Sequence, residues 1–319
     1  MIIERMASEL DIETAFIVNV ANRSRRYYRV FGIPKRSGGT RTVFHPSPVL
    51  KTFQYWLTRN VFAHVPVSDA AVAYRKGNSI KRNAEIHLGS KHLLHLDIKD
   101  FFPSIRGNML GRVIRDNHVR LNLVVDEKDE RVINGLCLLT DHLVIGSVCA
   151  PAISNAVMYR FDGAAQQLTG SQGMKYTRYA DDMVFSSNAF IEPSIVDRVE
   201  LLLKEEGFEL NRDKTFFMGN RGRKTVTGIV INAGYPSIGR TRKESIKTLL
   251  YRKLRYNEGD SAVILGHMSF LRDVEPDTFN SYVAKYGRLF NANVMETLIE
   301  ERRQSIEPAK SEVASTKAN

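Results

Sequence analysis

Residues 175–187 read KYTRYADDMVFSS, and this stretch decides the fold. Two runs rich in apolar and β-branched residues flank a short polar turn, a pattern that predicts a hairpin of two antiparallel strands. The turn carries two adjacent carboxylates, Asp181 and Asp182. Adjacent anions repel each other, and a bound divalent cation such as Mg²⁺ removes that cost. The pattern favours a metal site on a rigid scaffold, although an ordinary surface turn could carry the same two residues.

A third carboxylate lies upstream, in the segment HLLHLDIKDFF of residues 92–102. Asp97 ends a short apolar run that predicts a buried strand. Carboxylates at the ends of two strands could hold two Mg²⁺ ions about 3.5–4 Å apart, the spacing of two-metal phosphoryl transfer. One ion would activate a primer hydroxyl, and the other would hold a triphosphate and its leaving pyrophosphate. The sequence therefore predicts a catalytic and metal-binding set of Asp97, Asp181 and Asp182.

The remaining pattern predicts an α+β protein with an antiparallel palm. Helical spacing is found over 4–21, 49–64, 129–141, 152–167 and 193–206, and again from 104 and from 240 onward. Strands are predicted over 27–45 (two strands joined by a glycine turn), 92–97, 214–218 and 225–231. We expect a mixed helix-and-strand region over 1–232, a basic helical region over 233–303, and a disordered tail over 304–319.

Composition points to a polyanionic partner. The 319 residues carry a formal charge of +11 and a pI near 9.6. Residues 212–255 contribute twelve basic and two acidic side chains, nearly the whole excess. This charge favours nucleic acid, although a solvated surface would look similar. Cys137 and Cys149 show no zinc spacing and no disulfide framework. The chain shows no signal-peptide pattern or membrane span, so a cytoplasmic location is expected.

The chain resembles the reverse transcriptase family. LDIKDFF at 96–102 resembles its first catalytic motif, and YADD at 179–182 resembles its second. The resemblance implies a right-hand polymerase, with fingers and a ferredoxin-like palm over 1–232 and a basic helical thumb over 233–303. It also implies that the three aspartates bind two Mg²⁺ ions, and that deoxynucleoside triphosphates are the substrates.

The resemblance implies roles for other residues in nucleotide binding. Phe102 matches the aromatic gate that excludes a 2′-hydroxyl, although a core aromatic would look the same. Lys35 and Arg41, in the fingers hairpin, would grip the triphosphate, unless they belong to an ordinary basic turn. Lys214 would face the triphosphate, and Gly146 would let the backbone approach the nascent pair. Ile145 replaces a glutamine of the family pattern, which leaves fidelity and template preference open.

Two short signatures resemble the retron branch of the family: NAEIH at 83–87 and VTG at 226–228. Retron relatives copy their own structured non-coding RNA into multicopy single-stranded DNA, which stays branched from the RNA. They commonly act with an effector protein in antiphage defence. We expect the basic thumb, with Arg240, Arg242 and Lys243, to bind the cognate RNA. The alternatives are another bacterial, intron-like reverse transcriptase and a catalytically idle RNA-binding scaffold.

Overall fold

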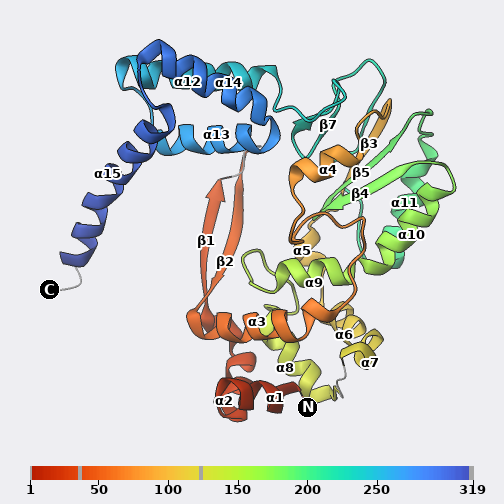
Figure 1. Cartoon of the computed structure of the whole chain (residues 1–319). Helices are drawn as coiled ribbons and strands as arrows, with labels where there is room; N and C mark the ends of the chain where they lie inside the picture. Colours follow the sequence, from red (N-terminus) through yellow and green to blue (C-terminus); the bar gives the residue numbers. More distant parts are fainter. Residues whose placement is uncertain (1, 35–37, 122–124, 316–319) are drawn as a thin grey trace. The chain divides into compact units, whose positions relative to one another are not determined.

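The computed structural model describes residues 2–34, 38–121 and 125–315, with side chains through residue 304 (Figure 1). The chain forms two compact units. The first, here the palm unit, comprises Met1–Ser79 and Ser90–Asn220. The second, here the C-terminal unit, comprises Ile80–Gly89 and Arg221–Asn319. The C-terminal unit begins at Arg221 and includes a short internal segment, whereas the sequence placed the boundary at 232; the assignment of fingers, palm and thumb remains a prediction.

The palm unit is built on a four-stranded antiparallel sheet. Its strands are β3 (His92–Asp97), β4 (Lys175–Tyr179), β5 (Asp182–Ser187) and β6 (Phe216–Met218), in the spatial order β4-β5-β3-β6. Helices join β3 to β4 and β5 to β6, which gives the strand–helix–strand–strand–helix–strand order of a ferredoxin-like fold. The α+β class and the ferredoxin-like palm are thereby confirmed. The centre of the sheet is the pair β3 and β5, which carries the predicted carboxylates.

Helices of the palm unit share one apolar core with the sheet. They are α1 (Ile2–Leu10), α2 (Thr14–Asn22), α3 (Pro48–Asn60), α5 (Phe101–Ser104), α6 (Gly107–Asp116), α7 (His118–Leu121), α8 (Glu127–Cys137), α9 (Ala150–Val157), α10 (Tyr159–Gly170) and α11 (Ser194–Glu205). Short 3₁₀ turns lie at Ser24–Tyr27, Phe62–His64 and Arg212–Lys214. In Figure 1, α10 and α11 lie beside the sheet, and α10 contacts both β4 and α11. Buried side chains such as Phe53, Leu94 and Phe185 fill the interior, which gives the catalytic strands a rigid support.

The predicted fingers hairpin is present as β1 (Tyr28–Pro34) and β2 (Thr40–Pro46). Its register pairs Tyr28 with Pro46 and Pro34 with Thr40. Most of the side chains of this hairpin are exposed.

The C-terminal unit combines a small hairpin with a group of helices. It contains α4 (Ile80–Ile86), β7 (Thr225–Val226), β8 (Ile229–Val230), α12 (Arg240–Tyr256), α13 (Ser261–Val274), α14 (Pro276–Phe290) and α15 (Val294–Ser315). The helix α4 packs on the β7–β8 hairpin, where the Thr227 hydroxyl donates to the Ile80 carbonyl at 3.2 Å. The predicted helix from residue 240 is confirmed, and Ile246 and Leu250 are its fully buried residues.

Several predicted elements differ in the structure, and one of them is the helix over 152–167, which is divided into α9 and α10 at Met158. Residues 4–21 form two helices, because Asp11 has a positive φ of 52° that ends α1. Residues 225–231 form a hairpin, because Thr227 and Gly228 have φ values of 47° and 80°, suited to a two-residue turn. The tail expected over 304–319 is helical to Ser315, since polar residues such as glutamate and lysine are good helix formers; 316–319 lie outside the described residues.

Candidate active site

The palm brings two of the predicted carboxylates face to face. Asp97 is the last residue of β3, and Asp182 is the first residue of β5. In the antiparallel register these two residues are direct partners. Because directly opposed residues have Cβ atoms about 4.5–5.5 Å apart, both carboxylates lie together where the two central strands meet the β4–β5 turn. The register therefore brings carboxylates from the two segments together, and their role as a metal site remains a prediction.

The third carboxylate stands on the two-residue turn between β4 and β5. Tyr179 pairs with Asp182, which leaves Ala180 and Asp181 as the loop. Ala180 has a positive φ of 61°, as the first loop residue of a tight hairpin requires. The Asp181 carbonyl accepts a hydrogen bond from the Ile98 amide at 3.1 Å. This bond ties the turn to the residue that follows Asp97.

Burial and nearby negative charge make Asp181 and Asp182 difficult to ionise. Burial raises the pKa of Asp182 to about 6, and the charge of Asp97 adds to that rise. Burial also raises the pKa of Asp181, with further contributions from Asp97 and Asp182. The positive charge of Lys214 acts in the opposite direction on both pKa values. The site therefore concentrates anionic charge that a cation would stabilise.

Lys214 places a positive charge beside the Asp97 carboxylate. Its Nζ donates to both carboxylate oxygens of Asp97, each at 2.9 Å. The bond to Asp97 is also the main cause of a raised pKa at Lys214. Asn211 adds a side-chain bond to Asp97 at 3.2 Å, while its backbone amide donates to the Asp97 carbonyl at 2.8 Å. Lys214, predicted to face a triphosphate, thus lies at the carboxylates.

The donor set suits a hard divalent cation. Carboxylate oxygens are the ligands that Mg²⁺ and similar ions prefer, with water and phosphate completing the shell. Within the described ranges, the side chains as they stand do not bring three metal-binding groups around one point. Asp97 is turned to Lys214, so binding of an ion would exchange an ammonium partner for a metal partner. The raised pKa of Asp182 shows which charge such an ion would relieve.

A stacked aromatic pair lies beside Asp182. The His95 ring stacks on Phe216 with 4.9 Å between ring centroids, and its Nδ1 lies 3.4 Å from Oδ1 of Asp182. Burial lowers the pKa of His95, which favours its neutral form. Phe102 is half-buried on α5, packs against the core, and meets Phe101 at 5.3 Å between centroids. Its role as a gate remains a prediction.

The fingers hairpin accounts for Gly146. The Phe44 amide donates to the Ile145 carbonyl at 2.8 Å. Gly146 has φ +105°, and a Cβ there would lie 2.4 Å from the Phe44 carbonyl oxygen. The structure thus explains this glycine by contact with β2, whereas a role in nucleotide binding remains a prediction. Arg41 is exposed on β2, opposite Ile33. Lys35 lies outside the described residues.

The predicted RNA-binding residues lie on α12 of the C-terminal unit and differ in their surroundings. Arg240 is exposed. The Arg242 guanidinium lies over the Phe270 ring, 4.9 Å from its centroid. Lys243 forms an ion pair with Glu275, whose side chain is buried. All three remain predictions, and Lys243 already has a protein partner.

Both retron-like signatures lie in the C-terminal unit. Asn83 and His87, of the NAEIH segment, are fully buried on and after α4. Within the part of the chain that the structure describes, the Asn83 amide has no hydrogen-bond partner. The VTG segment forms the turn of the β7–β8 hairpin on which α4 packs. Two signatures far apart in the sequence therefore belong to one structural element.

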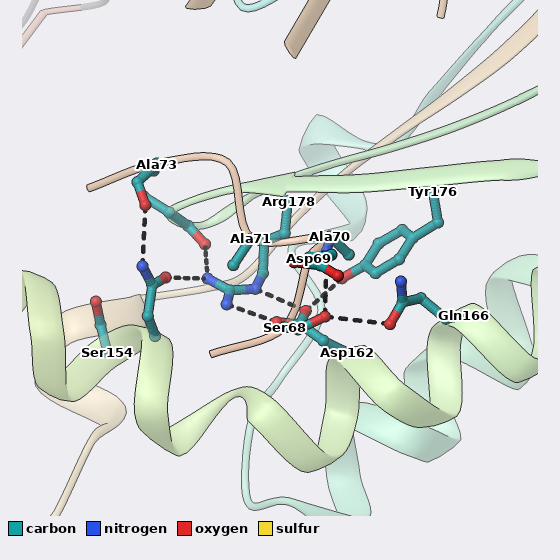
Figure 2. A network of polar contacts seen from close by, with 12 residues as sticks. Ser68, Asp69, Ala70, Ala71, Ala73, Ser154, Asp162, Gln166, Tyr176 and Arg178 are labelled. Atoms are coloured by element: carbon teal, nitrogen blue, oxygen red, sulfur yellow. Dashed lines mark hydrogen bonds and ion pairs between the residues drawn. The ribbon is translucent and has the colours of Figure 1, made fainter. Parts of the chain in front are cut away.

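Sequence reasoning missed a buried polar network beneath the turn (Figure 2). Arg178 on β4 pairs with Asp162 on α10, and Tyr176 also donates to Asp162 at 2.9 Å. Asn155 on α9 accepts from Arg178 at 3.3 Å and donates to the Ala73 carbonyl at 2.9 Å. Arg178 is a charged residue within a strand predicted to be buried. It could have indicated this network, because a buried charge requires a partner.

Known proteins are similar in sequence to most of this chain. The family model described as "Reverse transcriptase (RNA-dependent DNA polymerase)" matches residues 33–251. The chain is 27% identical over 293 residues to the retron Ec86 reverse transcriptase of Escherichia coli, covering 90% of this chain and 89% of that protein. It is 31% identical over 301 residues to the E. coli retron Ec73 reverse transcriptase, covering 88% and 95%. With the retron Mx65 reverse transcriptase of Myxococcus xanthus it shares 32% over 273 residues, covering 79% and 62%.

Similar solved structures include apo telomerase from Candida tropicalis, with 12% identity and a TM-score of 0.48. That match covers 86% of this chain and 61% of the telomerase chain. Among the helices that the structure describes, none combines the length and the apolar character needed to cross a bilayer.

Proposed function

The chain belongs to the reverse transcriptase family, as an RNA-directed DNA polymerase of the retron type. We propose that Asp97, Asp181 and Asp182 bind two Mg²⁺ ions, at which the enzyme adds deoxynucleotides to a primer hydroxyl on a structured RNA template. The observation that carries this proposal is the register that makes Asp97 and Asp182 direct partners. The two-residue turn between β4 and β5 adds Asp181 at the same end of the central strands. Members of this family use divalent metal ions, and the donor set fits that chemistry.

The chemistry is the transfer of a nucleotide. The primer hydroxyl forms a bond to the α-phosphorus of a deoxynucleoside triphosphate, the bond to pyrophosphate breaks, and the hydroxyl proton is released. Bound Mg²⁺ ions would lower the cost of charge on the attacking and leaving oxygens. Asp97, Asp181 and Asp182 hold the positions at which that charge is neutralised. Lys214, whose Nζ donates to Asp97 at 2.9 Å, would turn its ammonium towards the triphosphate and keep it bound to Cε.

The nucleic-acid substrates follow from the relatives named as retron reverse transcriptases. We propose that the template is a cognate non-coding RNA, primed from one of its own 2′-hydroxyls. The product would be multicopy single-stranded DNA that remains branched from the RNA. The VTG turn and the NAEIH helix support the retron assignment over an intron-like enzyme. Antiphage defence with an effector protein, and a cytoplasmic location, belong to the same proposal.

Three conservative variants test the metal site. Asp97→Asn, Asp181→Asn and Asp182→Asn each keep the side-chain shape but lose the charge that binds the cation. We expect each to lose nearly all primer extension while RNA binding stays close to wild type. Asp213→Asn is the matched control, because Asp213 is an exposed carboxylate in the neighbouring 3₁₀ turn.

The assays are extension of a primed RNA with dNTPs and MgCl₂, and RNA binding on the same preparations. Substantial extension by the Asp181 variant would contradict the two-ion assignment. Loss of extension in the Asp213 control would show that charge removal near the site is damaging in general.

A further inference from the structure

Arg178 is a fully buried arginine that lies three residues before Asp181. Its guanidinium holds Asp162 with two bonds, from Nε to Oδ1 at 2.8 Å and from Nη2 to Oδ2 at 2.7 Å (Figure 2). Both side chains are 0% exposed. An ion pair in the interior gives little net stability compared with apolar side chains of similar volume. Stability is therefore a poor explanation for this pair, and its other contacts become informative.

A further donor of the guanidinium is directed at the acidic turn. Nη1 of Arg178 donates to the Ala180 carbonyl at 3.0 Å. Ala180 holds a φ of 61°, a costly conformation for a residue with a Cβ, and such strain persists only where the surroundings over-determine it. The carbonyl belongs to the peptide group that joins Ala180 to Asp181. Fixing this peptide plane, together with the bond from the Ile98 amide to the Asp181 carbonyl at 3.1 Å, restricts the direction in which the Asp181 side chain leaves the backbone.

The main chain of Arg178 is held as firmly as its side chain. Its amide donates to the Ala70 carbonyl at 2.7 Å, and its carbonyl accepts from the Val72 amide at 2.8 Å. On the other side it pairs with Met183 of β5. The guanidinium therefore projects from a fixed point, and its distance to the turn cannot adjust by sliding of β4.

We propose that Arg178 is a positioning residue for DNA synthesis. Anchored on Asp162, it holds the Ala180 carbonyl and so aims the carboxylates of Asp181 and Asp182. The planar fork of arginine is needed, because one group must bind a carboxylate with two bonds and still reach the carbonyl. The inference rests on the proposed two-ion site and adds the residue that orients it.

Two variants separate positioning from folding. Arg178→Lys keeps a cation beside Asp162 but removes the fork. A triple variant, Tyr176→Phe, Asp162→Leu and Arg178→Met, replaces the polar group by apolar side chains, a change that is often neutral or stabilising. Tyr176→Phe alone is the matched control, because it removes one bond to Asp162 and keeps the bonds of Arg178.

The measurements are single-nucleotide extension on a pre-primed generic RNA, the KM for dNTP, the MgCl₂ concentration for half-maximal rate, and the melting temperature. We expect Tyr176→Phe to stay within about twofold of wild type. Arg178→Lys and the triple variant should lose about 10- to 100-fold in kcat, the scale of a displacement near 1 Å. Their KM should change less than about threefold, while the half-saturating MgCl₂ concentration rises. A merely structural pair predicts altered melting with unchanged kcat and MgCl₂ dependence per folded molecule.

The outcomes are distinguishable. A folded Arg178→Lys enzyme, or a folded triple variant, with the kcat and MgCl₂ dependence of Tyr176→Phe would overturn the inference. If the triple variant does not fold, Arg178→Lys decides alone, because it retains the ion pair. An active Asp181→Asn enzyme would refute the two-ion site whatever Arg178 does. An inactive Asp181→Asn enzyme beside a fully active Arg178→Lys enzyme would refute the positioning role only.

Discussion

Replacing Asp182 by asparagine is expected to stabilise the protein at neutral pH when divalent cations are removed. The pKa of Asp182 is raised from its ordinary 3.8 to about 6, chiefly by burial. A difference of this size corresponds to about 3 kcal/mol of folding free energy. Since 35% of the side chain is exposed, solvent screens its charge, and we expect a gain of about 1–2 kcal/mol.

The gain in the free energy of unfolding from Asp182→Asn should increase as the pH rises. Below about pH 4 the Asp182 carboxyl is protonated in both the folded and the unfolded chain, so the variant gains nothing. Between about pH 4 and 6 the folded chain keeps its proton while the unfolded chain has lost it, and the advantage of the variant grows with pH. Above about pH 6 the carboxylate is ionised in both states and the full gain is present.

The assay is urea unfolding of wild type and Asp182→Asn in EDTA, at pH 4 and at pH 7.5. MgCl₂ should then stabilise wild type at pH 7.5 more than the variant, because ligand binding to the folded state raises stability by mass action. Asp213→Asn serves as an exposed control and should show no gain. Equal stability of wild type and Asp182→Asn at pH 7.5 would refute the reasoning, as would an equal gain at both pH values.

Three further outcomes follow from the geometry. Phe102→Val should raise ribonucleotide over deoxyribonucleotide incorporation by about tenfold or more in kcat/KM, by removing a steric clash; an unchanged ratio would make Phe102 a core residue only. Gly146→Ala should destabilise the protein by about 2–5 kcal/mol, from a positive φ and from contact with the Phe44 carbonyl; urea unfolding with no loss would contradict this. Arg240→Gln combined with Arg242→Gln should weaken RNA binding and reduce the slope of log affinity against log salt by about 0.7–0.9 per lost phosphate contact; an unchanged slope would assign these arginines to a solvated surface.

Much of the palm could be predicted because its signals are local. The alternation of apolar residues around Asp181 and Asp182 indicated a hairpin, and the apolar run before Asp97 indicated a buried strand. Each of these strands can be predicted from a few consecutive residues of its own. The family resemblance then supplied the pairing of the two segments, which no local pattern contains.

The rest of the site depends on contacts between distant segments. The Lys214 ammonium contacts the Asp97 carboxylate, although the two residues are more than a hundred positions apart in the sequence. No periodicity in the sequence indicates this contact. Arg178 was read as part of a strand, but its partner Asp162 stands on a helix predicted only by apolar spacing. Polar pairs of this kind are specified by tertiary packing rather than by local propensity.

The division of the chain into two units has a consequence for the order of biosynthesis. The segment Ile80–Gly89 leaves the ribosome before most of the palm unit, yet its partners in the C-terminal unit begin only at Arg221. At about 5–20 residues per second, α4 waits on the order of ten seconds for the β7–β8 hairpin. During that interval its buried face, which includes Asn83, has nothing of its own unit to pack against. The palm unit can therefore form its own core before the NAEIH segment has its partners, although that segment is synthesised earlier than most of the palm unit.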